Sequence, residues 1–238
     1  MSLKLRAISL DLDNTLWDTP PVLARAEAVL QAWLTAHYPR IPQQFPAGEL
    51  QRLRAELALA QGERAHDLSW LRTETLRRAA LASGYRAEVA EAAFEVFLAA
   101  RNDIEPYAEV RPALARLAAR WPLYALSNGN ACVQRAGLGK YFRGAIDAGR
   151  AGAAKPAARI FVQLLAAAGA AADEVLHVGD DAIADVAGAR DIGMRTVWMN
   201  RARGSWPAAV ARADHEVHDL TELADLVEQL APVTPRGR

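Results

Sequence analysis

Two aspartates at the end of a short apolar run most strongly constrain how this chain can fold. Asp11 and Asp13 follow residues 5–10, a run typical of a strand buried in a parallel sheet. Ligand sites in open α/β sheets form at the carboxyl ends of strands, where these carboxylates would lie. Burying two neighbouring carboxylates is costly unless a cation or proton compensates them. The pattern is therefore compatible with a cation and phosphate site, or with an ordinary polar turn.

The composition describes an ordinary globular protein, with 238 residues, of which 52% are hydrophobic and 24% charged. Because 28 basic residues balance 28 acidic ones, we expect no nucleic-acid partner bound by broad electrostatics. A single cysteine, Cys132, excludes an internal disulfide and a cysteine-based metal cluster. No apolar run is long enough to span a bilayer, so we expect a cytoplasmic protein without a membrane partner. The oligomeric state stays open.

The spacing of apolar residues divides the chain into two kinds of region. Residues 18–106 have only helical spacing, which predicts an insertion of four helices, the first ended by Pro39 and Pro42. Residues 1–17 and 107–231 alternate strands with helices, which predicts an α/β core built on a doubly wound parallel sheet. We thus expect a discontinuous core carrying an all-helical cap domain. Residues 232–238 are predicted to form a disordered tail.

Polar side chains end three of the predicted strands. They are Asp11 and Asp13 after the first strand, Ser127 and Asn128 after the second, and Asp180 and Asp181 after a later one. Because the carboxyl ends of parallel strands share one edge of a sheet, we expect these groups to converge. Lys155, just before a helix, and Asp185, about one helical turn beyond Asp181, complete the set. Each is an ordinary turn, cap or surface residue by itself, but their order and spacing favour a phosphate site.

Each of these residue types has a use in phosphoryl transfer. An aspartate can attack phosphorus and form an aspartyl-phosphate, which divides one difficult displacement into two easier ones. A second carboxyl can protonate the leaving oxygen and then deprotonate water. Hydroxyl, amide and backbone N–H groups can hold phosphoryl oxygens, and a lysine tempers the repulsion between nucleophile and substrate. A further carboxylate supplies the hard oxygen ligands that Mg²⁺ prefers.

Four segments, in this order, resemble the motifs of the haloacid dehalogenase superfamily. They are Asp11-Leu12-Asp13-Asn14-Thr15-Leu16, Leu126-Ser127-Asn128-Gly129, Lys155-Pro156, and Val178-Gly179-Asp180-Asp181-Ala182-Ile183-Ala184-Asp185. The resemblance covers the whole chain, and the helical insertion lies where that family has its type 1 cap. It implies a Mg²⁺-dependent phosphatase that acts on a small phosphorylated metabolite.

The resemblance also implies a role for each motif residue. The catalytic and phosphate-binding residues are Asp11 as nucleophile, Asp13 as general acid and base, and Ser127, Asn128 and Lys155 around the phosphoryl group. The metal ligands are Asp180, the Asp11 carboxylate and the Asp13 backbone carbonyl, supported by Asp181 and Asp185. Asn14 stands where many relatives have aspartate, and we expect it to contribute mainly its backbone.

Asp13 discriminates among the reactions of the superfamily. The dehalogenases and phosphonatases lack an acid at that position, so an aspartate there favours phosphate monoesters, although phosphomutases share it. Three further segments, residues 121–131, 137–142 and 176–181, resemble bacterial phosphatases of riboflavin biosynthesis. These act on flavin mononucleotide (FMN) and on 5-amino-6-(5-phosphoribitylamino)uracil, so the resemblance predicts one of these substrates.

Four residues in or beside the cap are candidates for contact with the leaving group: Trp17, His66, Trp70 and Arg72. An aromatic ring can stack on a flavin or pyrimidine, and Arg72 suits a second phosphate or a carbonyl-rich ring. Packing or surface roles remain open for all four.

Two non-enzymatic alternatives also stay open. An aspartate-phosphorylated receiver likewise gathers acidic residues and a lysine on a parallel sheet, but it is shorter and lacks a helical insertion. A scaffold protein that keeps only the fold would have lost some of Asp11, Asp13, Lys155 and Asp180, which are all present.

Overall fold

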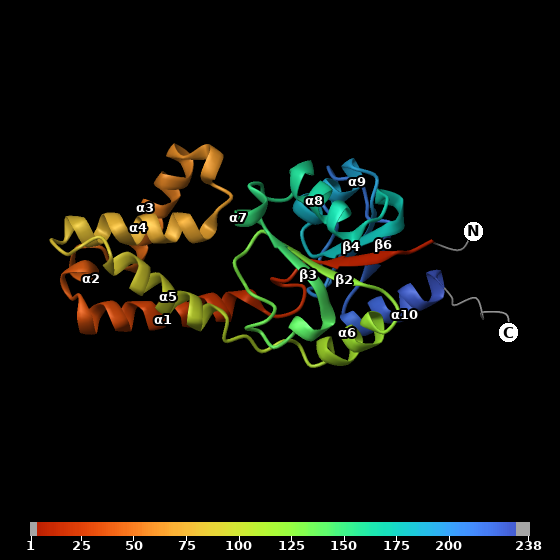
Figure 1. Cartoon of the computed structure of the whole chain (residues 1–238), viewed down its shortest axis with the longest axis horizontal. Coiled ribbons are helices and arrows are strands. Elements are labelled where there is room, and N and C mark those ends of the chain that lie inside the picture. Colours follow the sequence, from red (N-terminus) through yellow and green to blue (C-terminus); the bar gives the residue numbers. More distant parts are fainter. Residues whose placement is uncertain (1–3, 232–238) are drawn as a thin grey trace.

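A six-stranded parallel sheet forms the centre of the core, in a computed structural model that describes residues 4–231 (Figure 1). The strands are β1 (Ala7–Leu10), β2 (Leu123–Ser127), β3 (Phe142–Asp147), β4 (Val175–Gly179), β5 (Arg195–Met199) and β6 (His215–Val217). Their order is β3-β2-β1-β4-β5-β6, so β1 lies between β2 and β4. This order brings together the three strand ends at which the sequence has its polar groups. The predicted tail, residues 232–238, lies outside the described residues.

Helices cover both faces of the sheet (Figure 1). On one face lie α6 (Val110–Ala118) and α10 (Leu220–Leu230), and on the other α7 (Ala148–Ala151), α8 (Ala158–Ala168) and α9 (Gly188–Asp191). The strands β1, β2 and β4 are buried along their whole length, as expected for a sheet covered on both sides. The predicted doubly wound α/β fold is confirmed. Sequence patterns missed β6, an edge strand of 3 residues that is too short to show a period.

An all-helical cap is inserted between β1 and α6 and projects from one end of the core (Figure 1). Its helices are α1 (Thr19–His37), α2 (Arg40–Gln44), α3 (Ala47–Ala60), α4 (Leu68–Ala82) and α5 (Val89–Arg101). The cap has a hydrophobic cluster of its own, in which buried alanines such as Ala26, Ala79 and Ala93 let the helices approach closely around Phe97. The inserted helical cap is confirmed, whereas the domain boundaries at 18 and 106 stay a prediction.

The cap contains a short helix, α2, that the sequence analysis did not predict. Pro39 and Pro42 do end α1, but α2 begins directly after Pro39 and carries Pro42 in its first turn. Proline is tolerated there because the first N–H groups of a helix have no intrahelical partner. Ile41 is buried and anchors α2 to the cap. None of the helices within residues 4–231 is long and apolar enough to cross a membrane.

Candidate active site

The aspartate expected to act as nucleophile, Asp11, lies at the carboxyl end of β1 and is only 6% exposed. Its backbone N–H donates to the carbonyl of Val178 at 2.8 Å, so the pairing of β1 with β4 continues up to the site. The Lys155 ammonium donates to Asp11 Oδ1 at 2.5 Å and to the Leu126 carbonyl at 2.9 Å. The buried carboxylate is therefore paired with a buried cation, which offsets part of its desolvation cost.

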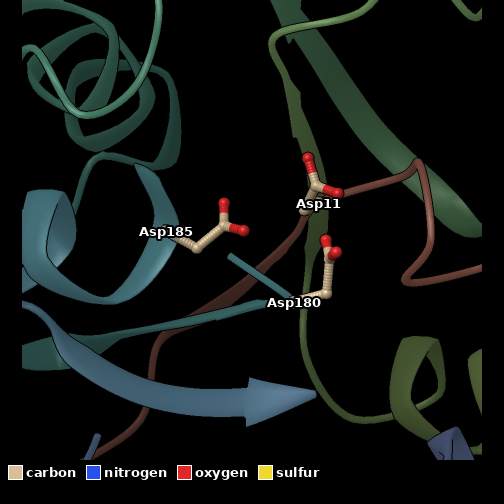
Figure 2. A group of neighbouring side chains, drawn as sticks. All are labelled: Asp11, Asp180 and Asp185. Carbon is tan, nitrogen blue, oxygen red and sulfur yellow. The ribbon is translucent and has the colours of Figure 1, made fainter. Parts of the chain in front are cut away.

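Three carboxylates, one directly after β1 and two in the segment after β4, converge at this edge of the sheet (Figure 2). Asp11, Asp180 and Asp185 each offer one oxygen, and these oxygens all lie within 4.8 Å of one another. Three carboxylates and the one ammonium of Lys155 carry a formal charge of −2 (−3 + 1). A divalent cation would neutralise this charge, and the all-oxygen donor set is the kind that Mg²⁺ prefers. The arrangement therefore fits a bound divalent metal ion.

Burial and mutual repulsion perturb these groups in the absence of a cation. Burial raises the pKa of Asp11 well above its usual value, although Lys155 opposes this, and it raises the pKa of Asp180 to about 6. At Asp185 burial acts in the same direction, but Lys155 and His177 together outweigh it and lower the pKa of that carboxyl. Asp11 and Asp185 in turn raise the pKa of Lys155 against the effect of burial. One ammonium cannot satisfy all three carboxylates, which is the electrostatic reason for a cation at this place.

Asp181 and Asp185, which both follow β4, have different roles. Asp185 joins the carboxylate cluster, whereas Asp181 caps the π-helical turn Ala182–Ala187 by accepting two backbone N–H groups at 2.8 Å each. Asp181 thus has a structural role in the loop, and its predicted supporting role at the metal stays a prediction. Gly179 makes this arrangement possible, because a Cβ there would lie 2.2 Å from the carboxyl of Asp185. Sequence reasoning gave Gly179 no role, although a glycine directly before the aspartates is a signal of close approach.

Two buried polar residues, His177 and Ser9, hold Asp185 through a chain of hydrogen bonds. His177 Nε2 lies 3.1 Å from Asp185 Oδ1, and the other ring nitrogen is hydrogen-bonded to the Ser9 hydroxyl. Burial lowers the pKa of His177. A neutral ring whose Nδ1 accepts from Ser9 and whose Nε2–H donates to Asp185 satisfies both contacts. His177 and Ser9 thus fix the orientation of a carboxylate in the cluster.

The end of β2 contributes a hydroxyl and an amide that behave differently. Ser127 is buried, and its Oγ accepts the Gly129 N–H at 2.9 Å, which leaves its hydroxyl proton for another acceptor. The amide of Asn128 is hydrogen-bonded twice to the backbone of Lys155, accepting its N–H at 2.7 Å and donating to its carbonyl at 2.9 Å. The structure therefore shows Asn128 positioning Lys155, and its predicted contact with phosphate stays a prediction.

The second aspartate of the motif, Asp13, faces the cap and lies apart from the carboxylate cluster. Its carboxylate accepts from Arg101 at 2.5 and 2.7 Å, from the Trp17 indole N–H at 2.9 Å and from the Thr19 hydroxyl at 2.9 Å. Trp17 is fully buried, so the predicted contact with a leaving group is replaced by packing and by this hydrogen bond. Arg101, at the end of α5, is a partner that no local pattern pointed to, because it is distant in sequence. Asn14 adds a side-chain contact to its expected backbone role, since its Oδ1 accepts the Thr19 N–H at 3.2 Å.

Two cavities lie where the cap meets the core. Of the three candidate residues within the cap, His66, Trp70 and Arg72, only Arg72 lines one of them. Arg72 lines a cavity of about 270 Å³ together with Asp13. A second cavity, of about 530 Å³, is lined by Ser127 and by residues 130–135. His66 and Trp70 line neither, and the Trp70 ring is instead covered by a guanidinium, that of Arg64, at 4.1 Å. Of the three, Arg72 alone is placed at a cavity that also reaches Asp13.

The chain is similar to known hydrolases in sequence and in structure. A model of the haloacid dehalogenase-like hydrolase family matches residues 5–193. The chain belongs to this family. It is 34% identical over 205 residues to the Escherichia coli 5-amino-6-(5-phospho-D-ribitylamino)uracil phosphatase YigB, covering 84% of this chain and 86% of that one. It is 31% identical to a phosphoserine phosphatase from Thermus thermophilus, covering 92% of this chain and 98% of the relative.

A solved structure described as a 2-haloacid dehalogenase from Pseudomonas syringae is also similar. It superposes with a TM-score of 0.89 at 35% identity, covering 94% of this chain and 99% of that one. The chain is thus an enzyme of a hydrolase family with phosphatase relatives, and the predicted family and fold are confirmed. The receiver and scaffold alternatives are set aside, since the family is hydrolytic and its motif residues converge here.

Proposed function

We propose that the protein is a Mg²⁺-dependent phosphomonoester hydrolase that works through an aspartyl-phosphate on Asp11. The observation that carries this proposal is that two neighbouring aspartates face different parts of the site. Asp11 points to Lys155 and the carboxylate cluster, whereas Asp13 points to the cap, where a leaving group would sit. A nucleophile and a separate proton donor are what phosphate monoester hydrolysis needs, while displacement of a halide needs no such donor.

The proposed reaction has two displacements. An Asp11 carboxylate oxygen attacks phosphorus, the bond from phosphorus to the leaving oxygen breaks, and Asp13 gives that oxygen a proton. Asp13 then takes a proton from water, which attacks the same phosphorus and releases phosphate from Asp11. Lys155 and the Ser127 hydroxyl hold the phosphoryl oxygens. Magnesium, held by Asp11, Asp180 and Asp185 and by the backbone carbonyl of Asp13, would supply charge neutralisation for the phosphoryl group.

We propose FMN or a phosphorylated ribitylaminouracil precursor of riboflavin as the substrate. Segments of the chain resemble phosphatases of that pathway, and the relative YigB is described as acting on the ribitylaminouracil phosphate. The protein would then act in the cytoplasm on a small phosphorylated metabolite, without nucleic acid or membrane as partner.

Phosphate release from a panel of esters tests the proposal. The panel contains FMN, O-phosphoserine and phenyl phosphate, each with Mg²⁺ and with a chelator, and Asp11→Asn serves as the blank. We expect release that requires Mg²⁺ and disappears in the blank, with FMN preferred. A parallel assay follows halide release from 2-chloropropionate, because one structural relative is described as a haloacid dehalogenase. Halide release without phosphate release would overturn the proposal.

A further inference from the structure

The cavity beside Asp13 is unusually rich in arginine. It measures about 270 Å³ and is bounded by Arg54 and Arg72 of the cap, by Arg101 at the end of α5, and by Asp13 and Gly129 of the core. The side chains of Arg54, Arg72 and Arg101 are largely buried, with 25%, 12% and 2% of their surface exposed, and the most buried, Arg101, contacts Asp13. Guanidinium groups are rarely buried in such number without an anion or another strong acceptor.

The charges around this cavity do not balance within the protein. Glu27 pairs with Arg72 at 2.8 Å and lies 3.8 Å from Arg54, while Asp13 pairs with Arg101. Three guanidinium groups against two carboxylates leave one positive charge in excess (3 − 2). The excess increases when Asp13 carries the proton that the leaving group needs. Burial, with Arg54 nearby, lowers the pKa of Arg72 to about 10, which reflects the cost of the crowded positive charges.

A second observation points to a missing acceptor. The Nη1 atom of Arg101 is buried without a hydrogen-bond partner among the described residues. Leaving a buried donor of a charged group unsatisfied costs about 1–3 kcal/mol, so such groups normally find a partner in the working state of a protein. Arg101 lines the cavity and also holds Asp13, so a group bound there lies close to the proposed proton donor.

The cavity wall is also apolar in part. Leu23 and Leu68 line it, and both are partly exposed, at 38% and 46%. Phe97 forms another part of the wall and carries the Arg72 guanidinium on its ring face. Apolar surface next to fixed hydrogen-bond donors suits a flat ring edged with carbonyl oxygens better than it suits a small aliphatic carboxylate.

We propose that this cavity is the subsite for the leaving group, and that Arg54, Arg72 and Arg101 select a heteroaromatic ring bearing carbonyl oxygens. The inference rests on the proposed phosphatase function and specifies the part of the substrate that the carboxylate cluster does not touch. Arg101 then links recognition to chemistry, because it contacts both the subsite and Asp13.

The test compares two esters in matched variants. For Arg72→Gln and Arg54→Gln we expect the ratio of kcat/KM for FMN to that for phenyl phosphate, whose ring lacks carbonyl oxygens, to fall by about 10- to 100-fold. Arg54→Gln keeps the test decisive if Arg72→Gln folds poorly, because Arg54 is partly exposed. Arg86→Gln, an arginine on the cap surface with 87% of its side chain exposed, is the matched control and should leave the ratio unchanged.

A second readout is direct binding. Riboflavin fluorescence titrated with wild-type protein should give a Kd that rises about tenfold in Arg72→Gln. An unchanged ratio and an unchanged Kd would overturn the subsite while leaving the phosphatase intact. If the variants lose activity only on O-phosphoserine, the subsite binds a carboxylate, and the proposal that it selects a ring is wrong. Absence of phosphate release from every ester by the wild-type protein would instead overturn the proposed function, and this inference with it.

Discussion

The two sides of the catalytic motif differ in where their partners come from. On the core side, Asp11 is held by Lys155 and Asp185 lies beside it, and all three are at most 6% exposed. On the cap side, the Asp13 side chain is 22% exposed and depends on Arg101, which arrives from a different domain-like unit of the chain. The sheet and the segments that follow its strands hold the first set within the core, whereas the contact of Asp13 with Arg101 exists only when the cap is in place. From this contrast we infer that the core residues carry out the reaction, whereas the cap determines which substrate reacts and when.

The largest effect should come from removing the nucleophile on the core side. Asp11→Asn should lower turnover by at least about a thousandfold, because an amide cannot form the acyl-phosphate. Its fold should be retained, since the amide replaces a carboxyl of the same shape. Phosphate release together with a thermal melt measures both quantities. A variant that keeps more than a few per cent of activity would refute the covalent route.

A smaller effect should come from the cap side. Arg101→Met should lower kcat by about 10- to 100-fold for phenyl phosphate, because Asp13 loses the partner that positions it. The loss should be smaller for p-nitrophenyl phosphate, whose leaving group needs less protonation, and Arg101→Lys should recover part of it. Steady-state kinetics on the two esters provide the measurement. Equal losses on both esters would show that Arg101 does not act through the proton donor.

Loss of the hydrogen bond between His177 and Asp185 should weaken metal binding more than it destabilises the fold. His177→Gln removes the contact that orients Asp185, and partners of metal-binding carboxylates typically change affinity by about tenfold or more. Calorimetric titration with Mg²⁺ should show this weakening. The matched control is His37→Gln, at an exposed position on the cap, which should bind Mg²⁺ like the wild-type protein.

The smallest effect concerns stability and pH. Because burial raises the pKa of Asp180 from 3.8 to about 6, its charged form destabilises the folded state, and the penalty grows as pH rises through this window. Without divalent cations, Asp180→Asn should therefore increase the free energy of unfolding by about 1–2 kcal/mol at about pH 8. The gain should shrink as the pH approaches about 4, where the carboxyl is protonated in both states.

Urea denaturation in a chelator measures this difference, and added Mg²⁺ should stabilise the wild-type protein more than the variant. If Asp180→Asn is less stable than the wild-type protein at the higher pH, the electrostatic cost assigned to the cluster is wrong.

The core side could be predicted from the sequence because its signals are local. Asp11, Ser127 and Asp180 follow apolar strands, and parallel strands must bring their ends to one edge. The role of each residue at that edge was harder to predict from the sequence. Asn128 holds Lys155 and Asp181 caps a turn, and such tasks depend on hydrogen bonds that the residue type alone does not specify.

The cap side could not be predicted, because its contacts join distant residues. Arg101 ends a helix whose apolar spacing indicates packing and nothing more, and its pairing with Asp13 depends on the angle between cap and core. Trp17 was expected to meet a substrate because it follows the catalytic loop, yet it packs inward. Local periodicity predicts which helices form, while their placement depends on the tertiary structure.

The most direct test of the central claim is to trap the phosphorylated enzyme. Wild-type protein and Asp13→Asn would be mixed with p-nitrophenyl phosphate and Mg²⁺, quenched in acid and digested for mass spectrometry. The account predicts a phosphoryl group on the peptide that contains Asp11, and more of it in Asp13→Asn, because that variant cannot activate water. Phosphate release by the wild-type protein with no adduct on that peptide in either protein would contradict it.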